Sequence, residues 1–140
     1  MPARSSVFLD TSAWFAALSA RDEHHARARQ GYEALVEDGG RLVTSNLVVA
    51  EVHALLARRL GGPTALRFRD SLYGVAAHEV RHVTRELERA ALDRWLRPFQ
   101  NHRFSLCDAV SFEIMRQERI RTAFALDRHF TVAGFEVVPA

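Results

Sequence analysis

Short apolar runs alternate with longer amphipathic segments along the chain, and this alternation constrains the fold more than any other feature of the sequence. The apolar runs have the length of buried strands and lie at residues 5–9, 41–44, 122–126 and 135–139, and the short segment 78–83 is predicted to be a further strand. Between them, the sequence predicts helices over residues 11–18, 22–40, 45–62, 63–74, 84–99 and 105–120. This order predicts a single α/β domain over residues 1–140, with a central, mostly parallel β-sheet flanked by helices.

Local signals set the predicted ends of several helices. Thr11 or Ser12 is expected to cap the first helix, Asp22 the second, and Thr84 the helix that runs to residue 99. The glycine pair at 39–40 is expected to end the second helix, because glycine readily adopts the left-handed conformation found there.

Composition narrows the functional classes. All 19 basic residues are arginine, so the chain lacks the lysine of a Walker A loop, of a Schiff base or of a phospho-receiver. A net charge of +2 is too small to indicate nucleic-acid binding by itself. The single cysteine, the lack of a long apolar run and the early charges in "MPARSSVFLD" predict a cytoplasmic protein with no membrane segment.

Residues 78–82 spell H-E-x-x-H, the zinc-protease signature in which two histidines share one face of a helix. Here the motif lies in a short segment between Gly74 and Thr84, which is predicted to be the third strand of the sheet. In a strand, His78 and His82 would be roughly 13 Å apart and could not bind one zinc ion. We therefore reject a zinc-protease function.

Acidic residues stand at unusual positions of the predicted fold. Asp10 and Asp127 each follow an apolar strand, and the carboxyl ends of parallel strands meet at one edge of a sheet, where ligands bind. Glu51 lies four residues after Leu47 and four before Leu55, which predicts a position on the apolar stripe of its helix. A buried carboxylate there costs several kcal/mol unless it is paired or binds a metal.

A fourth acid, Asp108, is expected in the first turn of its helix, where the helix dipole favours negative charge. Each acid has a structural alternative: Asp10 as a helix cap, Asp127 as a turn residue, and Asp108 in a capping box with Ser105. Taken together, four acids converging on one cleft would repel one another. A hard divalent cation with oxygen ligands would neutralise them.

Four stretches around these acids resemble PIN-domain ribonucleases and, within that family, the VapC-type toxins of toxin–antitoxin pairs. They are, in order, "VFLDTSAWFA", "TSNLVVAEV", "SLCDAVSF" and "ALDRHFTVAGFEVVP". The resemblance implies a PIN fold with strand order 3-2-1-4-5 and the activity of a metal-dependent endoribonuclease, a hydrolase that cleaves RNA. It carries catalytic and metal-binding roles to Asp10, Glu51, Asp108 and Asp127.

Two further positions bear on that site. Ser12 takes the place of the hydroxyl that supports the active site in the family. Ala125 departs from the pattern, because the family often has a threonine two residues before the fourth acid. The missing hydroxyl leaves the role of Asp127 open.

The expected cofactor is Mg²⁺ or Mn²⁺. We expect Asp10 and Asp108 to be direct ligands, with Glu51 and Asp127 completing the shell directly, through waters or around a second ion. An ion so held can polarise the scissile phosphate and activate a water. The predicted products carry a 5′-phosphate and a 3′-hydroxyl.

The resemblance also implies partners, namely an RNA substrate, a small VapB-type antitoxin and a second copy of the chain in a homodimer. Residues 47–68 could clamp an antitoxin helix, although core packing explains most of the same side chains. Candidate RNA-binding residues are Arg58, Arg59, Arg67, Arg69, Arg128 and His129. Arg128 and His129 are the strongest candidates because they adjoin Asp127, whereas any one of the others could be an ordinary solvated side chain.

Two other functions share parts of this pattern. A catalytically idle PIN-like domain that only binds RNA or a protein would share the fold. A phospho-receiver has a similar alternation of strands and helices, but it needs a lysine that this chain lacks.

Overall fold

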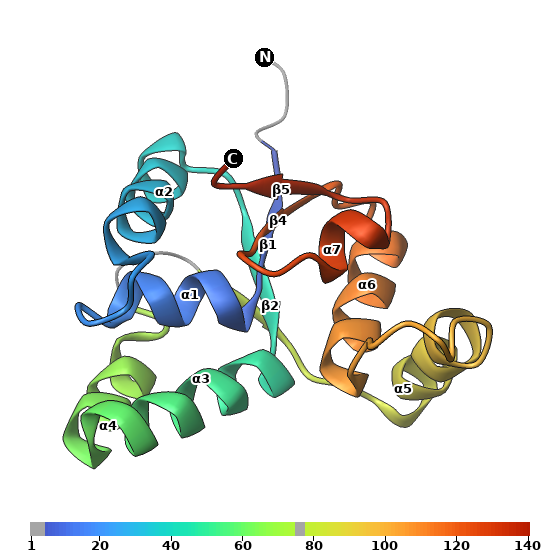
Figure 1. The fold of residues 1–140 in the computed structure, drawn as a ribbon, viewed down its shortest axis with the longest axis horizontal. Helices are drawn as coiled ribbons and strands as arrows, with labels where there is room; N and C mark the ends of the chain where they lie inside the picture. Colours follow the sequence, from blue (N-terminus) through green and yellow to red (C-terminus); the bar gives the residue numbers. More distant parts are fainter. Residues whose placement is uncertain (1–4, 75–77) are drawn as a thin grey trace.

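The computed structural model describes residues 5–74 and 78–140, and within them five strands form one sheet in the order β3-β2-β1-β4-β5 (Figure 1). Every neighbouring pair is parallel. The strands are β1 (Val7–Leu9), β2 (Leu42–Ser45), β3 (His78–Arg81), β4 (Thr122–Phe124) and β5 (Glu136–Val138). The structure therefore confirms the predicted parallel α/β sheet and its order. The predicted domain, 1–140, includes residues 1–4 and 75–77, which lie outside the described residues.

Helices cover both sides of this sheet, with α1 to α4 on one side and α5 to α7 on the other (Figure 1). None of the helices in the described residues combines the length and the apolar character that a membrane span requires. Their bounds are α1 (Thr11–Leu18), α2 (His25–Asp38), α3 (Asn46–Leu60), α4 (Gly62–Ser71), α5 (Arg85–Ala91), the π-helix η1 (Leu92–Leu96), α6 (Leu106–Glu118) and α7 (His129–Val132).

The central strands form a fully buried base under the carboxyl edge of the sheet. Phe8 of β1 pairs in register with Val43 of β2 and Ala123 of β4, and none of the three side chains is exposed. On the α6 side, the ring of Phe112 meets that of Phe130 edge-on, with centroids 5.0 Å apart. Such close packing holds the ends of β1, β4 and α6 in fixed relative positions.

The structure corrects several predicted helix ends. Asp10, rather than Thr11 or Ser12, is the N-cap of α1, and its side chain accepts a hydrogen bond from the backbone N–H of Ser12. Asp22 does not cap α2, which begins at His25. Its carboxylate instead accepts from the N–H two residues later, a local turn that competes with helix initiation.

Other predicted ends are confirmed. Thr84 caps α5 through the N–H of Leu87, and Gly39 ends α2 with φ of 71°. Within the segment 84–99, the observed helical structure is shorter than predicted. The α-helix α5 passes into the π-helix η1, which ends at Leu96. The four-residue helix α7 was not predicted, since one turn is too short to show a helical period.

The H-E-x-x-H segment forms a strand, as predicted. His78 is the first residue of β3 and is buried, while His82 lies beyond the strand and is exposed. Both ring nitrogens of His78 already have partners, since Nδ1 contacts the carbonyl of Leu72 and Nε2 lies 2.8 Å from the hydroxyl of Tyr32. This histidine is therefore a packing residue of the sheet.

Candidate active site

Three acids meet at the carboxyl edge of the sheet. Asp10 follows β1 directly, and its backbone N–H donates to the carbonyl of Phe124 at the end of β4, at 3.0 Å. Asp127 comes three residues after β4, and Asp108 lies in the first turn of α6. Asp10 and Asp108 are buried, with 4% and 7% of their surfaces exposed, so they form the floor of the site while Asp127 is half-buried.

Ser12 joins two of the strand ends that build this site. Its hydroxyl donates to Oδ2 of Asp10 at 2.6 Å and accepts from the backbone N–H of Leu126 at 2.9 Å. The carboxylate on the β1 side is thus tied to the segment that carries Asp127. Ala125, at the position where the family often has threonine, is buried and contributes only a methyl group.

Asp108 combines a structural contact with a place in the site. It forms the predicted capping box, in which its N–H donates to Oγ of Ser105 and its Oδ2 accepts from the N–H of Ser105. The same Oδ2 lies 2.7 Å from Nδ1 of His129. A carboxylate can only accept hydrogen bonds, so Nδ1 is the donor in this contact.

His129 is the residue whose place in the site the sequence did not reveal. Its backbone N–H donates to Oδ1 of Asp127 at 3.0 Å, while its ring reaches Asp108. Within the described residues, one ligand atom from each of Asp108, Asp127 and His129 lies within 4.8 Å of the other two. The only sequence signal was proximity, two residues from an acid, and it supported no more than an RNA contact.

The electrostatics of the cluster disfavour three bare charges. Burial, followed by the charges of Asp127 and then Asp108, raises the pKa of the Asp10 carboxyl to about 7, against the opposing effect of the hydrogen bonds from Ser12. Burial and the charge of Asp108 also raise the pKa of Asp127. A positive group at this edge would relieve both effects.

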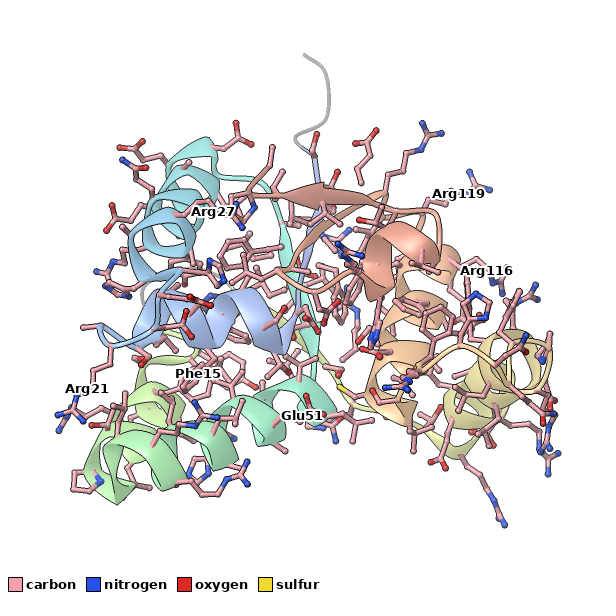
Figure 2. The ribbon with its side chains drawn as sticks, in the orientation of Figure 1. Phe15, Arg21, Arg27, Glu51, Arg116 and Arg119 are labelled. Atoms are coloured by element: carbon pink, nitrogen blue, oxygen red, sulfur yellow. The ribbon has the colours of Figure 1, made fainter. Side chains whose placement is uncertain are left out.

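The position of Glu51 on its helix differs from the predicted one. The buried stripe of α3 consists of Val48, Val49, Val52 and Leu56, and Glu51 lies beside it and is exposed (Figure 2). The inference that it is a buried carboxylate was therefore wrong, because the stripe is offset by one residue from the pattern of leucines. Glu51 is nevertheless restrained, since Oγ1 of Thr11 donates to its carboxylate at 2.7 Å.

Glu51 also borders the acid cluster through Cys107. Burial, then the charges of Glu51, Asp10 and Asp108, raise the pKa of the Cys107 thiol. The thiol therefore stays protonated and is an unreactive neighbour of both Glu51 and the other acids.

The proposed RNA-binding arginines lie on the surface. The exposed ones are Arg58, Arg59, Arg67, Arg69 and Arg128. The guanidinium of Arg59 lies over the ring of Phe15, 5.9 Å from its centroid, so that part of its role is packing. Arg128 precedes α7 and is the one that adjoins the acids along the chain. RNA binding by this set stays a prediction.

Comparison with known proteins identifies the family and the fold. The family model of the PIN domain matches residues 7–136. The chain is 36% identical over 134 residues to the 23S rRNA-specific endonuclease VapC20 of Mycobacterium tuberculosis, covering 95% of this chain and 98% of that protein. It is 32% identical over 140 residues to the ribonuclease VapC26 of the same organism, covering 95% and 100%.

Solved structures agree. The crystal structure of VapC20, described as a sarcin–ricin loop cleaving toxin, matches with a TM-score of 0.81 at 34% identity, over 92% of this chain and 95% of that one. FitAcB from Neisseria gonorrhoeae matches with a TM-score of 0.68 over 94% and 95%, and at 17% identity it supports the fold alone.

A parallel five-stranded sheet of this order, with acids at its carboxyl edge, is the architecture of the PIN domain, and the chain belongs to that family. Within the family, its relatives are VapC ribonucleases, which confirms the VapC-type endoribonuclease toxin expected from the sequence.

Proposed function

We propose that Asp10, Asp108 and Asp127 form the catalytic centre of this endoribonuclease, with Glu51 at its border. The observation that carries the proposal is the convergence of three acids from separate parts of the chain, tied together by Ser12 and His129. Structural roles alone do not account for it, because a helix cap and a capping box would not require a third acid to share the same desolvated edge.

A divalent cation, Mg²⁺ or Mn²⁺, fits the residues present. Asp108 and Asp127 offer carboxylate oxygens within 4.8 Å of each other and of a nitrogen of His129, and Asp10 is buried beside them. Oxygen ligands suit both ions, and an imidazole is better tolerated by Mn²⁺ than by Mg²⁺. When bound, such an ion supplies Lewis-acid polarisation of the phosphodiester and lowers the pKa of a water.

The chain's own residues orient this centre. Ser12 holds the Asp10 carboxylate toward the site, and His129 holds Asp108. Thr11 holds Glu51 on the rim, where its exposed carboxylate can accept a proton from an approaching water. Attack by water predicts products with a 5′-phosphate and a 3′-hydroxyl, whereas attack by the RNA's own 2′-hydroxyl would leave a 2′,3′-cyclic phosphate.

The substrate we propose is ribosomal RNA, by similarity to VapC20, whose name and structure describe cleavage of 23S rRNA at the sarcin–ricin loop. The test is to incubate purified protein with ribosomes and, separately, with protein-free rRNA in Mg²⁺ or Mn²⁺, and to sequence the new ends. Cleavage that disappears in EDTA and in Asp10→Asn supports the proposal. Cleavage that persists in Asp10→Asn places the chemistry elsewhere.

A catalytically idle, RNA-binding PIN domain is the second candidate. It shares the fold, but it gives no reason for Ser12 and His129 to hold two acids at such close range. RNA binding without any cleavage by the wild type would favour it.

The partners follow from the family. We propose a cytoplasmic homodimer neutralised by a small VapB-type antitoxin, whose helix contacts residues 47–68. Leu66 on α4 is 59% exposed, which leaves an apolar contact point on that segment. Co-purification with the product of a neighbouring short reading frame, and its loss in Leu66→Glu, would test this contact.

A further inference from the structure

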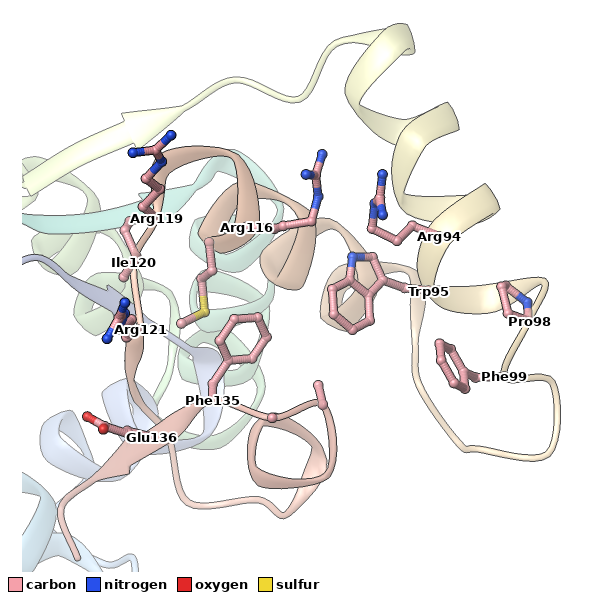
Figure 3. A pocket seen from close by; sticks show the side chains of 13 residues that line it. Arg94, Trp95, Pro98, Phe99, Arg116, Arg119, Ile120, Arg121, Phe135 and Glu136 are labelled. Atoms are coloured by element: carbon pink, nitrogen blue, oxygen red, sulfur yellow. The ribbon is translucent and has the colours of Figure 1, made fainter.

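The largest cavity described, about 760 Å³, lies away from the acids, between η1, the end of α6 and the start of β5 (Figure 3). Trp95, Phe99 and Phe135 line it with aromatic surface, together with the buried Met115. We call this cavity the η1 groove. Its aromatic lining suits a flat, unsaturated ring system.

The rim of the η1 groove is strongly basic. It carries four arginines, Arg94, Arg116, Arg119 and Arg121, against one lining acid, Glu136. Arg94 and Arg116 lie 3.3 Å and 2.8 Å from the buried Glu113, which fixes their positions.

The other two arginines are available to a ligand. Arg119 and Arg121 are exposed and form no ion pair within residues 5–74 and 78–140. Guanidinium groups of this kind bind phosphate through paired hydrogen bonds. The groove therefore offers aromatic faces and phosphate-binding groups side by side.

A row of rings joins the η1 groove to the acids. Phe99 contacts His102 with ring centroids 5.4 Å apart, His102 stacks on Phe104 at 5.1 Å, and Phe104 meets His129 at 5.7 Å. His129 in turn contacts Asp108. We call these four rings the ring row. His102 is exposed, Phe99 is 39% exposed, and Phe104 and His129 are half-buried, so the row is most open to a ligand at Phe99 and His102.

We propose that single-stranded RNA flanking the cleaved bond runs along the ring row and ends in the η1 groove, with bases on the aromatic rings and phosphates on Arg119 and Arg121. Bases stack on such rings without regard to sequence, and basic groups follow the backbone. This inference rests on the proposed function, because continuity with the catalytic centre is what favours RNA over an acidic protein segment.

The dimensions suit a short strand. Arg119 follows Asp108 by eleven residues at the other end of α6, which corresponds to about 17 Å at 1.5 Å per residue. A few nucleotides beyond the cleaved bond therefore reach the groove. A minimal substrate with no flanking nucleotides would not.

Binding is tested in the Asp10→Asn background, which prevents cleavage. The groove variant combines Arg119→Asn with Arg121→Gln; asparagine tolerates the left-handed backbone at position 119, where φ is 57°. The control combines Arg21→Gln with Arg27→Gln, which removes the same charge from exposed positions on the opposite side of the molecule (Figure 2).

Affinity for a fluorescent, random-sequence RNA oligomer is measured in EDTA across a salt series. We expect the groove variant to bind about tenfold more weakly and to lower the slope of log K against log salt by about 1.4, since each lost phosphate contact contributes about 0.7. The control should match the parent. Equal losses in the groove variant and the control would overturn the proposal.

A second measurement separates stacking from charge. Phe99→Ala should lower the affinity for the same RNA by about fivefold or more. In a Trp14→Phe background, RNA should quench the fluorescence of Trp95. If poly-glutamate quenches the fluorescence of Trp95 and RNA does not, the groove binds an acidic protein instead. That result would overturn the proposal.

Cleavage distinguishes failure of this inference from failure of the proposed function. In the active protein, the groove variant should lose kcat/KM on a long RNA and keep it on a minimal substrate. If Asp10→Asn abolishes cleavage while the groove variant cleaves both substrates like the control, the function stands and the RNA path is refuted. If RNA binding depends on the groove but nothing is cleaved, the path stands and the proposed catalytic function fails.

Discussion

Asp10→Asn is expected to abolish cleavage and, at neutral pH without metal, to make the protein more stable. The carboxyl of Asp10 is buried beside Asp127 and Asp108, which raises its pKa from 3.8 to about 7. The folded state therefore favours the protonated form. The stability that this preference contributes is fully present below about pH 4 and is lost as the pH rises through 7.

The magnitude follows from the pKa. A rise from 3.8 to about 7 corresponds to about 4 kcal/mol at 1.36 kcal/mol per pH unit. Asparagine, like the protonated carboxyl, carries no charge and keeps an oxygen that can accept from Ser12, and the pKa of about 7 already includes the hydrogen bonds from Ser12. The expected gain at pH 8 is therefore about 4 kcal/mol, or on the order of 10 °C in Tm for a chain of this size.

The assay is thermal unfolding of wild type and Asp10→Asn in EDTA at pH 8 and at pH 4.5, followed by circular dichroism. The difference in Tm should be large at pH 8 and small at pH 4.5. Mg²⁺ or Mn²⁺ should then raise the Tm of the wild type more than that of the variant, because binding to the folded state stabilises it. A variant that is equally or less stable at pH 8 would refute the electrostatic argument.

Three further substitutions test single contacts. Ser12→Ala removes the donor to Asp10 and leaves the N–H of Leu126 without its acceptor. The free energy of unfolding in urea should therefore fall by about 2 kcal/mol, and an unchanged midpoint would contradict this role. His129→Ala should lower kcat/KM about 10- to 100-fold with little change in the urea midpoint, and full activity would exclude it from the centre. Glu113→Ala should lower the free energy of unfolding by about 3–5 kcal/mol, because it breaks a buried ion-pair network. Glu113→Gln should lower it less, and equal losses would argue against a role for the charge of Glu113.

Four strands of the fold were predictable because each is a short apolar run between turn or cap signals, and β3, which is mostly polar, was predicted from its short length between Gly74 and the cap Thr84. The fully buried Phe8, Val43 and Ala123 belong to such runs. Short or irregular elements were not predictable in the same way. The helix α7 has a single turn, and η1 continues the helical pattern of α5 with a different hydrogen-bond spacing, so neither has a period of its own.

In the candidate site, too, some residues were predictable from local sequence signals and others were not. Asp10 and Asp127 were predicted from their positions after strands, and the capping box of Asp108 from its spacing to Ser105. Glu51 was placed on the wrong side of the stripe, because a helix turns by 100° per residue and a shift of one position moves a side chain from core to surface. His129 carried no pattern that would have revealed its contact with Asp108.

The sequence by itself determined the alternation of strands and helices, the acids that follow the strands, and the absence of lysine chemistry, because these depend on local periodicity and residue type. Only the tertiary structure decided which groups meet: Ser12 with Leu126, 114 positions apart, and His129 with Asp108, 21 apart. Those contacts depend on the order of the strands, which places β1 beside β4 and brings α6 to their shared edge. The ring row that leads from the acids to the η1 groove also depends on the tertiary structure. Its rings come from the loop before α6 and from α7, which lie apart in the sequence.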